Sequence, residues 1–335
     1  METGKTKVKV ETDNLKPLVD SLFSKDRYVI SCHINPECDA LGSQYAIYSL
    51  LRRHGKTAYM VDPDPVPEEF RFLPESENVL GIEDIKDIDY DAVITVDCSG
   101  EDRLGGLLGA YGKPVFINID HHISNTEFGQ VNWVDASASS ASEMVYWLFK
   151  FMNENFTKEE AEAIYAGIVN DTGCFRYPNT TVKTHIAASE LLSIGIDGYR
   201  IYQDIFESRT FEQIKVTADT LATLKSECHG KLVWMKFSPL GVEDAKPLYD
   251  ISDEVLNVAR QIREAEVFLL FKPAGPGMLR INFRSRGIVD VNSIAQRFGG
   301  GGHKTASGCK MSGQMDEVIP MVIDYIAKQL EGIDG

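Results

Sequence analysis

Carboxylate and imidazole side chains recur in the first half of the sequence, directly after segments that read as strands or helices. Eight residues form this set: His33, Glu37, Asp39, Asp97, Asp120, His121, His122 and Asp171. Carboxylates that crowd together repel strongly, so a positive ion is needed to hold them. Oxygen ligands with few imidazoles and no thiolate suit a pair of hard divalent ions, such as Mn²⁺ or Mg²⁺. Two such ions favour phosphoester hydrolysis.

The elements that must position these residues alternate between strand and helix. Short apolar runs predict strands at 27–33, 56–61, 91–96 and 115–119, and helical spacing predicts helices at 40–54, 139–152, 158–169 and 183–192. This alternation indicates a mostly parallel, doubly wound sheet. Ligands of such sheets bind beyond the carboxyl ends of the strands, where the first three clusters would converge. Asp171 follows a helix instead, and a cap or turn is its ordinary explanation.

The second half of the sequence predicts a smaller α/β domain. Strands are expected at 232–237, 267–272 and 279–284, and helices at 253–262, 291–298 and 317–329, the last two separated by a glycine-rich stretch. A connecting helix is expected at 210–225. The sequence therefore divides into an N-terminal domain (1–195), a linker (196–225) and a C-terminal domain (226–332).

Composition and charge exclude several classes of protein. The chain has 335 residues, with 34 Lys and Arg against 50 Asp and Glu, and a net charge of −16. Such a charge repels polyanions and argues against tracking along long DNA or RNA. No apolar stretch is long enough to span a membrane, and the start has no signal peptide, so we expect a cytoplasmic protein. The six cysteines form no CxxC pair, and reduced thiols are expected.

The blocks HINPECDALGS, VDCSG, IDHH and NDTG resemble, in order, the four motifs of the DHH phosphoesterase superfamily. Farther on, RSRGIVDVNSIAQRFGGGGHKTASG is similar to the signature of the DHH-associated C-terminal domain. In length and layout the chain looks most like the bacterial nano-RNase and phosphoadenosine-phosphate phosphatase group, the NrnA type. The resemblance spans roughly residues 25 to 310.

The resemblance implies a role for each residue of the set. One ion would be held by His33, Glu37 and Asp97, and the other by Asp39, Asp97, His121 and Asp171. A hydroxide between the ions would attack phosphorus. Asp120 would orient a histidine, and His122 would contact the phosphate or assist the leaving group.

Substrate recognition is expected from the second domain. Arg284 and Arg286 alternate along a strand, which predicts that they share one face and hold a terminal phosphate. Gly300, Gly301 and Gly302 would let backbone amides approach a ligand, and His303 would stack on or hydrogen-bond a nucleobase. A solvated strand face and a flexible loop are the ordinary alternatives for these two segments.

One position departs from the family pattern, because Glu37 stands where the first motif usually has aspartate. A glutamate still offers oxygen ligands, but its additional methylene shifts the carboxylate. We therefore expect a Mn²⁺-dependent hydrolase of very short oligoribonucleotides or of adenosine 3′,5′-bisphosphate. The alternatives are a phosphodiesterase of linear or cyclic dinucleotides and a nucleotide-binding regulator disabled by Glu37. A homodimer is left open.

Overall fold

The computed structural model describes residues 8–9, 14–107, 109, 115–238 and 251–331. The chain divides into two compact units, Met1–Ser208 and Arg209–Gly335. The division falls inside the segment that the sequence assigns to a linker. Within the described ranges, no helix combines the length and the apolar character that a membrane crossing requires.

A parallel sheet forms the centre of the first unit, in the order β1-β7-β6-β5-β2-β3-β4. Its strands are β1 (Val8–Lys9), β2 (Arg27–Ser31), β3 (Thr57–Asp62), β4 (Leu80–Gly81), β5 (Ala92–Val96), β6 (Val115–Asp120) and β7 (Val131–Val134). Every neighbouring pair runs parallel. The α/β fold class expected for this half is confirmed, while β1, β4 and β7 were not predicted.

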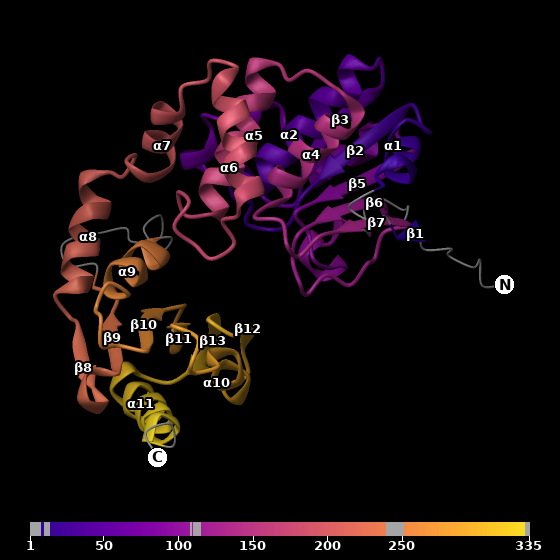
Figure 1. Cartoon of the computed structure of the whole chain (residues 1–335). Helices are drawn as coiled ribbons and strands as arrows, with labels where there is room; N and C mark the ends of the chain where they lie inside the picture. Colours follow the sequence, from indigo (N-terminus) through magenta and orange to yellow (C-terminus); the bar gives the residue numbers. More distant parts are fainter. Residues whose placement is uncertain (1–7, 10–13, 108, 110–114, 239–250, 332–335) are drawn as a thin grey trace. The chain divides into compact units, whose positions relative to one another are not determined.

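Helices cover one face of this sheet, as Figure 1 shows for α2, α4, α5 and α6. The helices of the unit are α1 (Lys16–Leu22), α2 (Cys38–Arg53), α4 (Ala141–Met152), α5 (Lys158–Asp171), α6 (Val182–Ser193) and α7 (Gly198–Phe206). The other face packs on 3₁₀ turns, which contribute Ile85 and Leu104. The sheet is thus buried on both sides, which explains why its strands read as continuous apolar runs.

Helix α5 packs so closely against α2 and α4 that residue 167 must be glycine. A Cβ atom on Gly167 of α5 would lie 2.0 Å from the hydroxyl of Ser142 and 3.0 Å from the Cα of Asp39. The N-terminus of α5 is fixed by a capping box, in which Thr157 and Glu160 each accept the other's backbone N–H. The residues at the ends of α2, α4 and α5 are therefore held close together.

A six-stranded mixed sheet forms the second unit, in the order β12-β13-β11-β10-β9-β8. Its strands are β8 (Lys225–Glu227), β9 (Leu232–Lys236), β10 (Val267–Pro273), β11 (Met278–Ser285), β12 (Gly301–His303) and β13 (Ala306–Ser312). Its helices are α8 (Phe211–Leu221), α9 (Ser252–Ala259), α10 (Val291–Arg297) and α11 (Met315–Glu331). This is the smaller α/β unit that the sequence predicts, but the glycine-rich stretch pairs as an edge strand instead of forming a loop.

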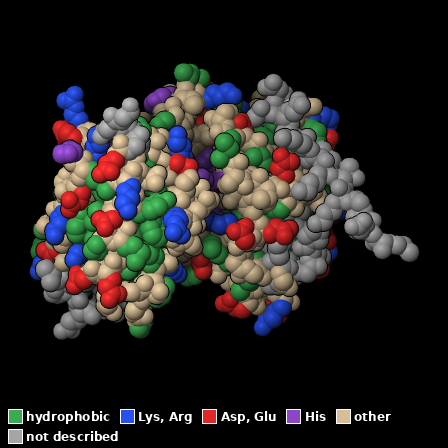
Figure 2. Space-filling view, turned by 90° about the horizontal axis from the view of Figure 1, so that it is seen from below, with side chains coloured by type: hydrophobic (Ala, Val, Ile, Leu, Met, Phe, Trp, Pro, Cys, Tyr) green, Lys and Arg blue, Asp and Glu red, His purple; other side chains and the backbone are tan. Residues whose placement is uncertain are grey.

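The second sheet also has apolar contacts on both faces. Ile281 and Phe283 pack with α10 and α11, whereas Phe268 and Leu270 pack with α8 and α9. All six cysteines of the chain are free thiols, as expected. On the visible face of the molecule, basic and acidic side chains are interspersed (Figure 2).

Candidate active site

The predicted site residues of the first unit lie at the carboxyl edge of neighbouring parallel strands. Strand β2 is followed by His33, β5 by Asp97, and β6 ends at Asp120. Because β6, β5 and β2 are adjacent in the sheet, their ends meet. Asp39 joins them from the first turn of α2, and Asp171 is the last residue of α5.

His121 lies at the centre of this cluster. Its Nε2 atom is 3.4 Å from Oδ1 of Asp97 and 3.8 Å from Oδ2 of both Asp39 and Asp171. Two groups of three residues each bring one ligand atom apiece within 4.8 Å of one another: Asp97, His121 and His122, and Asp39, His121 and Asp171. The structure therefore brings together the residues that the resemblance assigns to one of the two ions.

Asp39 is fixed by the N-terminus of α4. Its two carboxylate oxygens accept hydrogen bonds from the backbone N–H groups of Ala141 and Ser142, at 2.7 and 2.8 Å. The unpaired amides and the dipole of a helix N-terminus favour a negative charge there. The same geometry leaves Oδ2 of Asp39 on the side of His121.

Asp97 occupies a strained backbone position at the end of β5. Its φ angle is 51°, in the left-handed region that side chains other than glycine rarely adopt. Its Oδ2 atom is 3.4 Å from Nε2 of His33. Its Oδ1 atom is buried and has no hydrogen-bond partner, although imidazole nitrogens of His121 and His122 lie 3.4 and 3.5 Å away. A buried carboxylate oxygen without a hydrogen bond is costly, and a cation among these donors satisfies it.

Asp120 contacts the second histidine of the motif. Its Oδ1 accepts a hydrogen bond from Nδ1 of His122 at 2.8 Å, and its Oδ2 accepts one from Nδ2 of Asn125 at 2.6 Å. Asp120 is fully buried, whereas His122 is partly exposed. This contact is the one that an orienting role requires.

The charges of the cluster displace the pKa values of its members. Burial alone would raise the pKa of Asp97, but the close contacts with His121 and His33 and the charges of these rings outweigh burial and hold that pKa well below its usual range. Burial disfavours protonation of His121, yet Asp97, Asp171 and Asp39 raise its pKa to about 10. Burial and the charge of Asp39 raise the pKa of Asp171 to about 8. The cluster without a cation therefore retains protons that a cation would replace.

Glu37, the residue that departs from the family pattern, lies outside both three-residue groups. It is exposed at the N-cap of α2, and its Oε2 accepts a hydrogen bond from Nδ2 of Asn170 at 3.3 Å. Its charge contributes to the raised pKa of Asp171, so it remains near the cluster.

Three further polar residues contact the cluster and were not predicted: Arg103, Asn125 and Asn179. Arg103 contacts His33 through its guanidinium, and Asn179 donates to Oδ2 of Asp171 at 3.3 Å. Arg103 and Asn125 lie within six residues of Asp97 and Asp120, so their places in the same loops were the available signal.

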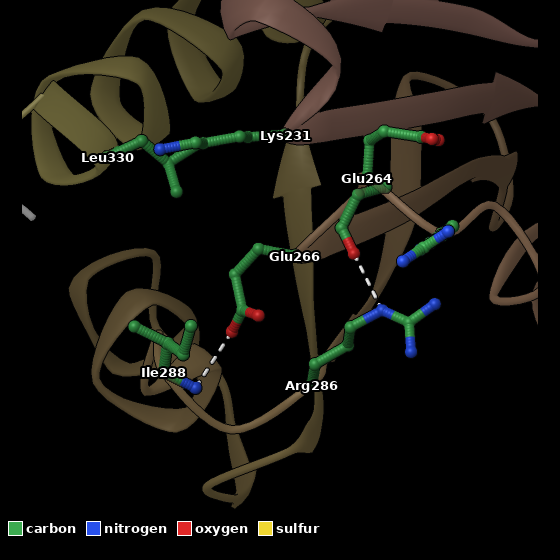
Figure 3. Close-up of a pocket in the computed structure, with 8 residues that line it drawn as sticks. Lys231, Glu264, Glu266, Arg286, Ile288 and Leu330 are labelled. Atoms are coloured by element: carbon green, nitrogen blue, oxygen red, sulfur yellow. Dashed lines mark hydrogen bonds between the residues drawn. The ribbon is translucent and has the colours of Figure 1, made fainter. Parts of the chain in front are cut away.

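Arg284 and Arg286 in the second unit have different surroundings. The guanidinium of Arg286 donates from Nε to the carbonyl of Ala265 at 2.8 Å, and from Nη2 to those of Arg260 and Ile262 at 2.8 and 3.0 Å. Arg260 is the C-cap of α9, so Arg286 satisfies carbonyls at a helix end. Figure 3 shows Arg286 beside a cavity of about 210 Å³, together with Glu266, which accepts from the N–H of Ile288 at 2.8 Å.

Arg284 lies opposite Ala306 of β13 and is partly exposed. Its Nη1 atom donates a hydrogen bond to the carbonyl of Phe283 at 3.0 Å. Arg286 is the more exposed of the two predicted phosphate ligands, although its guanidinium donates to the backbone carbonyls named above.

The glycines of the GGGH stretch differ in how much room the structure leaves for a side chain. A Cβ on Gly300 would lie 2.1 Å from the carbonyl oxygen of Gly308, so the pairing within the sheet itself excludes a side chain there. A Cβ on Gly301 would meet nothing closer than 3.8 Å, and Gly301, Gly302 and His303 are exposed along β12. The sheet therefore requires glycine at position 300, whereas it leaves room for a side chain at position 301.

Comparison with known proteins identifies the chain. The family model described as "DHH family, N-terminal domain" matches residues 27–168, and the "DHHA1 domain" model matches residues 244–328. The bifunctional oligoribonuclease and PAP phosphatase NrnA of Thermus thermophilus is 31% identical over 302 residues, covering 90% of this chain and 89% of the relative. The chain belongs to the DHH family. The Bacillus subtilis protein of the same name is 29% identical, covering 88% of this chain and 92% of the relative.

Solved structures share the fold of this DHH family member. An exopolyphosphatase-related protein from Bacteroides fragilis superposes with a TM-score of 0.87 at 24% identity, covering 96% of this chain and 98% of that one. The exonuclease RecJ bound to manganese gives a TM-score of 0.52 at 15% identity, covering 95% and 94%. At these identities the likeness concerns the fold alone. The family predicted from the sequence motifs is confirmed, and with it the phosphoesterase class.

Proposed function

We propose that this DHH family member uses divalent cations, with Mn²⁺ as the preferred ion, to hydrolyse very short oligoribonucleotides and adenosine 3′,5′-bisphosphate. The buried Oδ1 of Asp97, which lies among imidazole nitrogens but has no hydrogen-bond partner, carries the proposal for a cation. The names of the Thermus and Bacillus relatives, matched over most of both chains, support the substrates. RecJ, which shares the fold, has been solved with manganese.

Asp39, Asp97, His121 and Asp171 would hold a cation, and His33 would add a ligand on the other side of Asp97. Divalent cations at such a site polarise a phosphoryl group and lower the pKa of water. The helix α4 keeps the carboxylate of Asp39 oriented, through the two backbone N–H groups described above. The scissile phosphate would lie over His121, where the two groups of ligand atoms meet.

His122 is the candidate proton donor to the leaving oxygen. Its Nδ1 donates to Asp120, which fixes the direction of the ring, and its Nε2 would face the substrate. The pKa of His122 is raised, because the hydrogen bond and charge of Asp120 outweigh its burial. A pKa raised in this way favours the protonated ring, which suits the transfer of a proton to an alkoxide.

A substrate panel tests the proposal. Hydrolysis is measured with Mn²⁺ on adenosine 3′,5′-bisphosphate, di- to pentaribonucleotides, cyclic dinucleotides and a long single strand, beside the Asp97→Asn variant. We expect turnover of the bisphosphate and the shortest oligonucleotides, and loss of turnover in Asp97→Asn. Preference for a cyclic dinucleotide or for the long strand contradicts the proposed substrates.

A second function, nucleotide binding without catalysis, is favoured by one observation. Glu37, the expected ligand of the other ion, is exposed and outside both groups of ligand atoms. One bound ion per chain and no turnover on the whole panel would support this alternative.

A further inference from the structure

Arg103 carries an exposed guanidinium to the edge of the carboxylate cluster. It belongs to the 3₁₀ turn Glu101–Leu104, which follows β5 and Asp97. Its backbone is fixed at both ends, since its carbonyl accepts from the N–H of Ile34 at 2.8 Å and its N–H donates to Gly100 at 3.1 Å. Its Nη2 atom lies 3.1 Å from Nδ1 of His33.

The Nδ1 atom of His33 lies beside one hydrogen-bond acceptor and one hydrogen-bond donor. The carbonyl oxygen of Ile34, at 2.6 Å, needs a proton on Nδ1, whereas the guanidinium of Arg103 needs a lone pair there. A single ring nitrogen satisfies one of them at a time. The contact of Arg103 with His33 is therefore conditional on the tautomer of the ring.

Cation binding would decide between these two tautomers. A histidine that ligates through Nε2 carries its proton on Nδ1 and donates it, commonly to a backbone carbonyl. For His33 that carbonyl is Ile34, in the place that the structure already shows. Nδ1 then offers Arg103 no lone pair, and the exposed guanidinium is released beside the ligand cluster.

We propose that Arg103 is a substrate-binding residue, whose guanidinium binds a non-bridging oxygen of the phosphate held at the metal cluster. This inference rests on the proposed function and adds a residue to it. The candidate ligands at this edge are carboxylates and imidazoles, and the carboxylates of Asp39, Asp97 and Asp171 repel a phosphate. A guanidinium supplies both the charge and paired N–H donors for phosphate oxygens.

The test separates phosphate binding from support of His33. Calorimetry measures the affinity of the Mg²⁺-saturated full-length protein for inorganic phosphate and for adenosine 5′-monophosphate, in wild type, Arg103→Gln and Arg103→Lys. Arg71→Gln is the matched control, because Arg71 is an exposed arginine that neighbours only Glu68 among its described ion pairs. A separate titration with Mg²⁺ alone measures the affinity for the cation.

We expect Arg103→Gln to weaken phosphate binding by about tenfold to a hundredfold, the usual effect of losing a charged hydrogen bond. Arg103→Lys should recover part of that loss, and Arg71→Gln should match wild type. Unchanged phosphate affinity in Arg103→Gln overturns the inference, as does a wild type that binds no phosphate. Weaker binding of Mg²⁺ with unchanged phosphate affinity at saturation also overturns it, and makes Arg103 a positioning residue for His33.

The outcome is independent of the proposed substrates. If wild type binds phosphate through Arg103 yet hydrolyses nothing on the nucleotide panel, the proposed function fails and the inference stands. If nucleotides are hydrolysed and Arg103→Gln retains the wild-type KM, the proposed function stands and the inference about Arg103 fails.

Discussion

The Nδ1 atom of His122 donates a 2.8 Å hydrogen bond to the fully buried carboxylate of Asp120. The other oxygen of that carboxylate is held by Asn125, so the aspartate cannot rotate away without losing a second bond. The tautomer and the direction of the His122 ring are consequently set by a residue that no substrate reaches.

Asp120→Asn should therefore impair turnover without abolishing cation binding. The amide has the same shape but no charge, so it no longer stabilises a protonated His122 or one tautomer of its ring. We expect kcat to fall about tenfold to a hundredfold, with little change in the number of bound ions. Steady-state kinetics and a cation titration measure both. Asn125→Ala is the control for loss of the second bond alone, and a full-activity Asp120→Asn would remove the orienting role.

Cation affinity should increase with pH between about 6 and 10. In the cation-free cluster, the pKa of Asp171 is raised to about 8 and that of His121 to about 10, so both hold protons at neutral pH. A cation needs both groups deprotonated, and binding should release up to two protons below pH 8 and one between pH 8 and 10. Calorimetry in two buffers of different ionisation enthalpy counts these protons.

The raised pKa values of Asp171 and His121 also determine how the stability of the cation-free protein depends on pH. Both pKa values are raised above the unfolded values, so their stabilisation is complete at low pH and is lost as pH rises through about 8 and then 10. The chelated protein should therefore melt at a lower temperature at pH 9 than at pH 7, and the difference should shrink when cations are restored. For the cation titration described above, proton release close to zero at pH 7 would contradict the raised pKa values of Asp171 and His121.

Glu37→Gln and Glu37→Asp should distinguish a ligand from a disabling substitution. If Glu37 ligates through its longer side chain, the neutral glutamine should lose one ion and most of the activity, whereas aspartate should be mild or beneficial. If Glu37 disables the site, wild type should bind one ion and Glu37→Asp should restore activity. Ion stoichiometry and a Mn²⁺-dependent assay on a diadenylate are measured together. Glu68→Gln, which removes another exposed carboxylate, is the matched control.

Arg284→Ala and Arg286→Ala should affect different properties. Arg286 donates to three backbone carbonyls, so its loss should lower the free energy of unfolding by about 1–3 kcal/mol. Arg284→Ala should raise KM more than it lowers kcat, if the phosphate it holds is not the one that breaks. Denaturant unfolding of Arg286→Ala and steady-state kinetics of Arg284→Ala on a dinucleotide measure the two effects. An unchanged KM in Arg284→Ala would refute its role in phosphate binding.

The pattern of apolar residues predicted the elements that carry the site. Buried parallel strands such as β2 and β5 read as short apolar runs, and α5 starts at a capping box, so each has a local signal. Strand β7 was not predicted, because its four residues give only a short pattern. No strand was predicted at β12, because glycine is a poor strand former and only the pairing with β13 makes this stretch a strand.

The sequence by itself determined the family, the α/β class and which residue types are available for cation chemistry, because motifs and periodicity are local properties. The tertiary structure decided which of those residues meet. Asp39 is separated from Ala141 by about a hundred residues, yet the N-terminus of α4 fixes its carboxylate. Arg284 and Arg286 look equivalent in sequence, but the structure shows that Arg286 donates to carbonyls at the end of α9. Such contacts join distant segments, and no spacing along the chain encodes them.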